Sequence, residues 1–174
     1  MKTLDLIAVG LLASSVIQTC AQTWETSDSI VFPAAGPSAQ VDDIATAPNG
    51  VLYAIGASLN ASGSFEANWV RRSSDGGTTW QSVASFSPVS GNGINKLAVD
   101  NTGRLYAAGL VGGAWTVLSS MDQGQTWIAV DSFSTAGSSP EVRDIATDAN
   151  GAVYVVGVPI QSIALMALMQ RVSL

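Results

Sequence analysis

An eight-residue signature occurs twice in this chain, and its repetition is the strongest constraint on the fold. Both copies read Ser-x-Asp-x-Gly-x-Thr-Trp, one from Ser73 to Trp80 and the other from Ser120 to Trp127. The two copies are 47 residues apart, counted from Asp75 to Asp122. In a chain rich in short β-type runs, a repeat of this length predicts a β-propeller or another array of repeated units.

A second repeat is interleaved with the first and predicts how each unit is built. Its copies span residues 41–56, 94–109 and 142–157, and each ends in an apolar-Tyr-x-x-Gly run. Each copy holds two apolar runs on either side of a turn, and Asn49-Gly50 and Asn150-Gly151 are typical of such turns. All three tyrosines occupy the same repeat position, which predicts that they pack in the core.

Each unit is expected to contain four antiparallel strands. The hairpin supplies two strands, a third lies around 69–72 or 115–118, and Trp80 or Trp127 opens the fourth. Four up-and-down strands in about 50 residues form one propeller blade. We therefore expect an all-β fold of about three four-stranded blades, in units of about 22–74, 75–121 and 122–174. The apolar run Ile163–Met169 has helical propensity, but its repeat position predicts a loop and a third strand.

The signature consists of residues that build turns. Its Asp is expected to accept backbone N–H bonds, its Gly to adopt a conformation that other residues resist, and its Trp to pack on the neighbouring blade. We interpret the signature as structural, with a catalytic or calcium-binding carboxylate pair as the alternative. The residues concerned are Ser73, Asp75, Gly77, Trp80, Ser120, Asp122, Gly124 and Trp127.

The composition excludes several function classes. The chain has no histidine, which rules out Ser-His-Asp and Cys-His catalysis and histidine metal sites. Its net charge is −6 and its cations are scattered, so no basic stripe is present for nucleic acid. We expect neither a cofactor nor a metal site.

The first 21 residues have the features of a signal peptide. Lys2 precedes a mostly apolar run from Leu6 to Ile17, and small residues around Cys20 provide a cleavage point before Gln22. The run is too short to anchor the chain across a bilayer. We expect a secreted, periplasmic or cell-surface protein, and a lipid anchor on Cys20 is the less favoured alternative.

The two signature copies resemble Asp-boxes (BNR repeats), which are found in sialidases and in many other secreted propellers. Together with the hairpin repeat, the resemblance covers roughly residues 23–174. It implies propeller blades with each Asp-box at the outer rim, between the third and fourth strands. Sialidases use an arginine triad, a tyrosine paired with a glutamate, and an aspartate. None of these can be carried over, because all three tyrosines are repeat positions. The resemblance therefore implies a partial, non-catalytic member.

Three blades are fewer than the four that the smallest closed propellers need. The chain after the leader opens at Trp24 like a fourth strand, and it ends at Arg171 to Leu174 like a third strand. Two interpretations follow. The chain is a piece of a longer propeller, which we favour, or two copies form a homodimer that closes a six-bladed ring.

Polar residues where each first strand begins are the candidate ligand-binding positions. They differ from copy to copy, while their neighbours keep Ile or Leu and Ala. Such variation is expected of a binding site on a regular scaffold, and also of unconstrained solvent-facing positions. We expect the loops 57–68 and 110–114 at the same end. The candidates are Asp42, Asp43, Asn95, Lys96, Arg143 and Asp144.

Two function classes remain. The first is a secreted, non-catalytic propeller module or fragment that binds a glycan or a protein. The second is a fragment of a sialidase-like or other glycoside hydrolase that lacks its catalytic blades. Acids such as Asp43 and Asp144 would serve hydrolysis if their carboxyl groups lay about 5 Å or about 6.5–9.5 Å apart.

Overall fold

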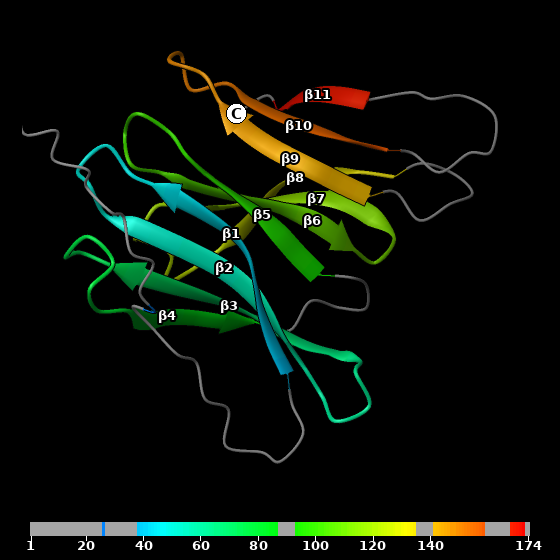
Figure 1. The fold of residues 1–174 in the computed structure, drawn as a ribbon. Coiled ribbons are helices and arrows are strands. Elements are labelled where there is room, and N and C mark those ends of the chain that lie inside the picture. Colours follow the sequence, from blue (N-terminus) through cyan, green and yellow to red (C-terminus); the bar gives the residue numbers. More distant parts are fainter. Residues whose placement is uncertain (1–25, 27–37, 87–92, 135–140, 159–167, 173–174) are drawn as a thin grey trace, which may run out of the picture.

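The computed structural model describes residues 26, 38–86, 93–134, 141–158 and 168–172, and the strands in these ranges form three sheets (Figure 1). The first sheet contains β1 Ser38–Thr46, β2 Leu52–Leu59, β3 Phe65–Ser73 and β4 Gln81–Phe86. The second contains β5 Gly93–Val99, β6 Leu105–Val111, β7 Ala114–Ser120 and β8 Ile128–Phe133. The third contains β9 Glu141–Thr147, β10 Val153–Val158 and β11 Leu168–Val172.

The sheet topology confirms the predicted fold class. Strands β1 to β4 and β5 to β8 form two four-stranded antiparallel sheets in sequence order, as in propeller blades. The third sheet has the order β11-β10-β9, so three of its expected four strands are described. The Trp24 segment that we expect to supply the fourth strand lies outside the described residues, as does the signal peptide 1–21. The proposed unit boundaries stay a prediction.

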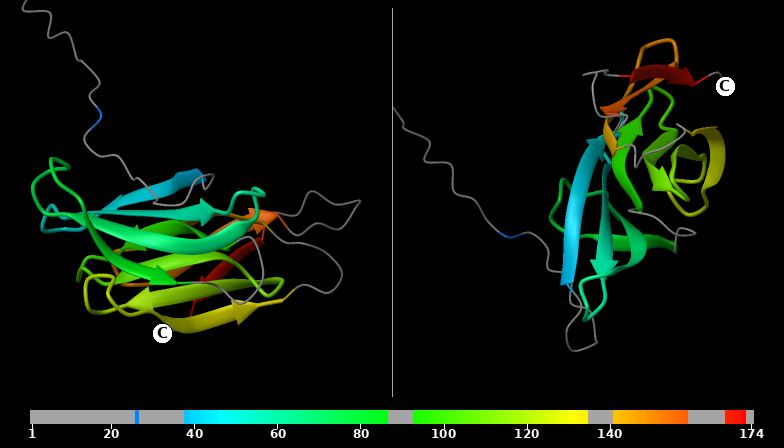
Figure 2. Two further views of the ribbon diagram at one scale, coloured as in Figure 1. Left: turned by 90° about the horizontal axis from the view of Figure 1, so that it is seen from below. Right: turned by 90° about the vertical axis from the view of Figure 1, so that its right-hand side faces the viewer.

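The sheets pack face to face, and their first strands lie side by side (Figures 1 and 2). Strand β1 contacts β5, and β5 in turn contacts β9. The chain therefore forms part of a propeller, with the first strand of each blade at the inner edge. Among the residues described, no helix has the length and apolar character that a membrane span requires.

Two apolar clusters hold the blades together, and strand β6 supplies side chains to both. Leu105 and Ala107 face the first blade, whereas Tyr106 and Ala108 face the third. This alternation follows from the two-residue period of a strand. Tyr53 lies in the cluster between the first and second blades, which is the place that Tyr106 takes between the second and third. Both tyrosines are buried, as their shared repeat position predicts.

Each first strand carries a β-bulge at the same repeat position. The pairing skips one residue between Val41 and Asp43, between Ile94 and Lys96, and between Val142 and Asp144. The repeated glycine lies across each bulge: Gly56, Gly109 and Gly157. A Cβ on these glycines would collide with the backbone oxygens of Gln40, Gly93 and Glu141, respectively. The glycine of the Tyr-x-x-Gly run is therefore required by a close backbone approach.

The hairpins are longer than their composition predicts. We expected loops over 57–68 and 110–114, but β2 continues to Leu59 and β3 begins at Phe65. Polar residues in these extensions are satisfied inside the sheet, since the buried Ser58 donates to the Ala67 carbonyl at 3.4 Å. The end of the apolar run 163–169 is part of strand β11, and its earlier residues lie outside the described ranges.

Candidate functional site

The six candidate ligand-binding residues lie at the bulges of three neighbouring inner strands. The skipped residues are Asp42, Asn95 and Arg143, and each is followed by a second candidate. A bulge redirects side chains relative to the regular alternation of a strand. The first four candidates lie on β1 and β5, and we call them the inner polar group: Asp42, Asp43, Asn95 and Lys96.

Asp42 is the member whose protonation is most affected by its surroundings. It is half-buried, and its Oδ1 accepts a hydrogen bond from Gln40 Nε2 at 2.7 Å. Burial raises the pKa of Asp42 above its usual value, and the charge of Asp43 adds to this, while Gln40 and the Lys96 ammonium oppose it. Strands β1 and β5, which carry Asp42 and Lys96, are in contact.

Asp43 connects the first two blades. Its Oδ1 accepts the Ile44 N–H at 2.8 Å, and its Oδ2 accepts the Leu97 N–H of the second blade at 2.9 Å. In the third blade, Asp144 likewise accepts the N–H of the residue that follows it, at 2.9 Å. The second blade has Lys96 at this position, which cannot accept, and the Leu97 N–H is satisfied by Asp43 instead.

The remaining candidates differ in their surroundings. Asn95 is half-buried, and its Oδ1 is buried without a hydrogen-bond partner. Arg143 is exposed and pairs with Glu141 at 2.9 Å, and Asp144 is exposed too. Among the described residues, no hydrogen bond or ion pair joins Arg143 or Asp144 to the inner polar group. A ligand-binding role of the six residues stays a prediction.

The two signature loops, residues 73–80 and 120–127, have the same hydrogen bonds. In the first, Ser73 Oγ donates to Asp75 Oδ1 at 2.8 Å and accepts the Gly77 N–H at 2.9 Å. The Thr79 N–H and hydroxyl donate to the two oxygens of Asp75 at 2.9 and 2.6 Å. Hydrogen bonds from Thr79, above all from its hydroxyl, lower the pKa of Asp75 to about 2.

The second loop repeats this arrangement closely. Asp122 accepts from Ser120 Oγ at 2.8 Å, from the Thr126 N–H at 2.8 Å and from the Thr126 hydroxyl at 2.6 Å. The Thr126 hydroxyl contributes most to a pKa of about 2 for Asp122. Gly124 has a φ of 88°, and its carbonyl accepts the Trp127 indole N–H at 2.9 Å.

The carboxylates of the signature loops bind donors of their own loops, and the structural interpretation of the signature stays a prediction. Both oxygens of each loop carboxylate are occupied by donors from the same loop. Within the described ranges, no three acidic or thiol side chains are grouped so that they could hold a metal ion. Trp127 packs on the cluster between the first and second blades.

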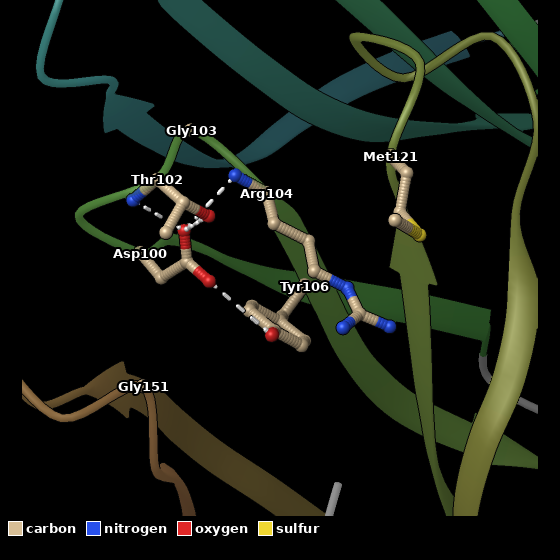
Figure 3. Close-up of a pocket in the computed structure, with 7 residues that line it drawn as sticks. All are labelled: Asp100, Thr102, Gly103, Arg104, Tyr106, Met121 and Gly151. Atoms are coloured by element: carbon tan, nitrogen blue, oxygen red, sulfur yellow. Dashed lines mark hydrogen bonds between the residues drawn. The ribbon is translucent and has the colours of Figure 1, made fainter.

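Sequence reasoning missed a hollow of about 450 Å³ near the second signature loop (Figure 3). Arg104 lies in its wall, where it follows the turn glycine Gly103. The arginine interrupts the repeat, because the first and third copies have the buried Val51 and Ala152 at this position. This departure from the repeat is the feature of the sequence that could have pointed to the hollow. The lining residues are Asp100, Thr102, Gly103, Arg104, Tyr106, Met121 and Gly151.

Asp100 forms the turn on one side of this hollow. Its Oδ1 accepts the Thr102 N–H, the Thr102 hydroxyl and the Arg104 N–H at 2.8, 2.6 and 3.0 Å. Its Oδ2 accepts the Tyr106 hydroxyl at 3.3 Å. Burial by itself raises the pKa of Asp100, but the hydrogen bonds outweigh burial and the net pKa is lowered. Asp100 is therefore ionised at neutral pH.

The comparisons with known proteins concern the fold. No protein-family model matches the sequence, and no curated protein matches it. Among solved structures, the chain is similar to a protein of unknown function from Dyadobacter fermentans, with a TM-score of 0.59 and 15% identity. That likeness covers 86% of this chain and 51% of the other, so the chain spans about half of that structure.

Two fungal enzymes are more distant matches. The GH93 α-L-arabinofuranosidase of Fusarium graminearum, in complex with arabinobiose, has a TM-score of 0.46 and 19% identity over 68% of this chain and 41% of that one. The α-L-arabinanase of Penicillium chrysogenum, also with arabinobiose, has a TM-score of 0.44 and 22% identity over 76% and 43%. These likenesses are too distant to indicate an activity, and what the Dyadobacter structure supports is the fold.

Proposed function

We propose that the protein is a secreted, non-catalytic propeller module that binds a glycan through its inner polar group. One observation carries this proposal: bulges at one repeat position bring different polar residues from two neighbouring blades together. Asp42 and Lys96 lie close enough for their charges to interact. The apolar residues around them stay alike from blade to blade.

The chemistry of the group suits a sugar. Glycans present several hydroxyl groups, each of which can donate one hydrogen bond and accept others. Asp42 supplies an acceptor and Lys96 supplies donors. Asn95 adds an amide, whose carbonyl oxygen is buried and has no hydrogen-bond partner among the described residues. A mixed set of donors and acceptors on a rigid sheet is an arrangement that can orient a sugar ring.

Hydrolysis by this group is the less favoured function. Glycoside hydrolysis needs two carboxyl groups, one that donates a proton and one that activates water or attacks the sugar. The raised pKa of Asp42 would suit the proton donor, and this observation supports the alternative of a glycoside hydrolase fragment. Its neighbour Asp43 is a poor second carboxylate, because both of its oxygens already accept backbone N–H groups.

Glycan binding is tested with immobilised glycans and the whole secreted chain. We expect Lys96→Met and Asp42→Asn to weaken binding to the preferred glycan by at least about tenfold, since each removes a charged hydrogen-bonding group. Asp131→Asn on the outer strand β8 is a matched control, because among the described residues its carboxylate accepts one hydrogen bond, from the neighbouring Ser132 N–H. Unchanged binding by both inner variants would refute the site. Glycan release that is lost in Asp42→Asn would instead support the hydrolase.

We also propose export with cleavage before Gln22, on the basis of the apolar leader. Intact mass measurement of the secreted chain tests it directly. A chain that begins at Gln22 supports cleavage, and a lipid-modified Cys20 would show a lipoprotein instead.

As the alternative to further blades of a longer propeller, we propose a second copy of this chain as the partner of the two outer blade faces. Val41 and Ile44 of the first blade are 63% and 56% exposed. The equivalent residues of the second and third blades are buried against the preceding blade. Ile94 and Leu97 are 1% and 4% exposed, and Val142 and Ile145 are 3% and 6% exposed. This face of the first blade therefore carries the apolar residues of a blade interface, but no preceding blade covers it.

The third blade presents the other half of the same interface. Tyr154 and Val156 are equivalent to Tyr106 and Ala108, which pack on the next blade, but here they are half-buried. A second copy can therefore place its first blade on this third blade with contacts that the chain already uses twice. A repeated head-to-tail contact of this kind closes a ring when the rotation fits.

A further inference from the structure

We propose that the hollow beside Arg104 binds the carboxylate of an acidic sugar, such as a uronate. Its position separates it from the inner polar group. Asn95 lies near the start of β5 and Asp100 directly follows the end of that strand, which places them about 16 Å apart along it. The proposal therefore does not depend on the function proposed for the inner polar group.

Arg104 is held in place by two buried neighbours. Its Nε donates to Ser119 Oγ at 2.7 Å, and its guanidinium carbon lies 5.4 Å from the centre of the Tyr106 ring. Ser119 and Tyr106 are each 1% exposed. A cation over an aromatic face and a hydrogen bond to a fixed hydroxyl orient the guanidinium before any ligand arrives.

The register of the sheets shows why the second blade has room for this arginine. The tyrosine of the first blade pairs with Arg72 on the third strand, and that of the third blade pairs with Arg171. In the second blade, Tyr106 pairs with Ser119. The serine is shorter, and it accepts a hydrogen bond from an arginine that comes from the preceding turn.

The outer part of the guanidinium is available to a ligand. Its Nε donates to Ser119, and the guanidinium also interacts with the Tyr106 hydroxyl, while the side chain extends beside the hollow (Figure 3). Asp100 forms no ion pair with it among the described residues, since the oxygens of its carboxylate accept from the turn and from the Tyr106 hydroxyl. Two parallel N–H groups on a planar fork match the two oxygens of a carboxylate.

Other features of the wall favour a sugar acid over other anions. The ionised Asp100 repels a dianion such as phosphate more than it repels a monoanionic carboxylate. Its Oδ2 accepts a single hydrogen bond, which leaves a lone pair for a ligand hydroxyl. Met121 is 79% exposed and offers an apolar surface to a sugar ring. A carboxylate with a hydroxyl nearby is the chemistry of a uronate.

The experiment is a titration of the whole secreted chain with glucuronate, followed by amide NMR shifts or calorimetry. Glucose is the neutral control, inorganic phosphate the more highly charged anion, and N-acetylglycine a monocarboxylate without sugar hydroxyls. We expect glucuronate to bind at least about tenfold more tightly than each of the three, because glucose lacks the carboxylate, phosphate is opposed by the Asp100 charge, and N-acetylglycine lacks the hydroxyl groups. Equal binding of phosphate or N-acetylglycine would overturn the sugar assignment.

Variants locate the binding. Arg104→Val introduces the residue that the first blade has at this position, and we expect it to remove the preference for glucuronate over glucose. Arg104→Lys keeps the charge without the fork and should lose at least about tenfold in affinity, so the proposal stays testable if the valine variant fails to fold. Glucuronate binding that survives in Arg104→Lys at full strength, or that is lost in Lys96→Met instead, would refute the site.

Discussion

The side-chain amide of Asn68 binds the backbone of Ile94 through both of its polar atoms. Asn68 Oδ1 accepts the Ile94 N–H at 2.9 Å, and Asn68 Nδ2 donates to the Ile94 carbonyl at 2.7 Å and to the Gly56 carbonyl at 3.1 Å. Asn68 is fully buried on β3 of the first blade, and Ile94 lies on β5 of the second. One amide thus fixes how two blades meet.

Replacing Asn68 by Ala should destabilise the chain by at least about 2 kcal/mol. The substitution removes a hydrogen-bond partner of the buried Ile94 N–H and of two carbonyl groups. A buried group left without a partner costs about 1–3 kcal/mol. Urea unfolding of the whole chain measures the change. Asn101→Ala is a matched control, because this exposed amide donates one hydrogen bond to the Ala149 carbonyl. Equal losses for the two variants would contradict the role of Asn68.

The signature loops should be required for stability and not for ligand binding. Asp75→Ala and Asp122→Ala each remove an acceptor of a serine hydroxyl, a threonine N–H and a threonine hydroxyl. We expect a lower melting temperature with unchanged affinity for glycan. A variant that keeps its melting temperature and loses ligand binding would contradict the structural interpretation.

The same two carboxylates predict how stability depends on acid. Their pKa values are about 2 in the folded chain, against an ordinary value of 3.8. A lowered folded pKa gives stability that is complete above the unfolded pKa and is lost as pH falls toward the folded pKa. We expect the loss between about pH 4 and pH 2, and a smaller loss in the Asp75→Asn/Asp122→Asn double variant. Denaturant unfolding at a series of pH values measures the stability of the wild-type chain and of the double variant. If the two proteins lost the same stability between about pH 4 and pH 2, the prediction would be wrong.

The repeats predicted the blades because residues that shape a strand or a turn act locally. The shared tyrosine position and the Ser-x-Asp-x-Gly spacing are visible in the chain itself. The Asn68–Ile94 contact joins residues 26 positions apart on different blades, and nothing local marks that asparagine as an inter-blade residue. The same holds for Asp43, whose Oδ2 accepts from Leu97 because Lys96 cannot accept. Arg104 was detectable only as a departure from the repeat.

The chain should not hydrolyse a sialoside. Three of the arginines have separate partners among the described residues: Arg71 donates to the Trp80 carbonyl, Arg104 donates to Ser119, and Arg143 pairs with Glu141. Tyr53 and Tyr106 are buried in blade interfaces. A fluorogenic sialoside assay on purified chain tests this. Turnover that one substitution in this chain abolishes would overturn the expectation.

Size-exclusion chromatography with light scattering should show either a homodimer or aggregates of the chain after leader removal. The apolar face around Val41 and Ile44 and the face around Tyr154 and Val156 each lack a neighbouring blade, and joining them buries both. We expect Ile44→Lys and Val156→Lys to give monomers of lower stability, because each places a charge in the new contact. Ile128→Lys is the control: Ile128 is 59% exposed on β8, away from both faces, and this variant should remain dimeric.

A wild-type chain that is a stable monomer would show that these faces need no second copy. Open polymers or aggregates would show that two copies do not close the ring, and would favour further blades of a longer chain as the missing neighbours.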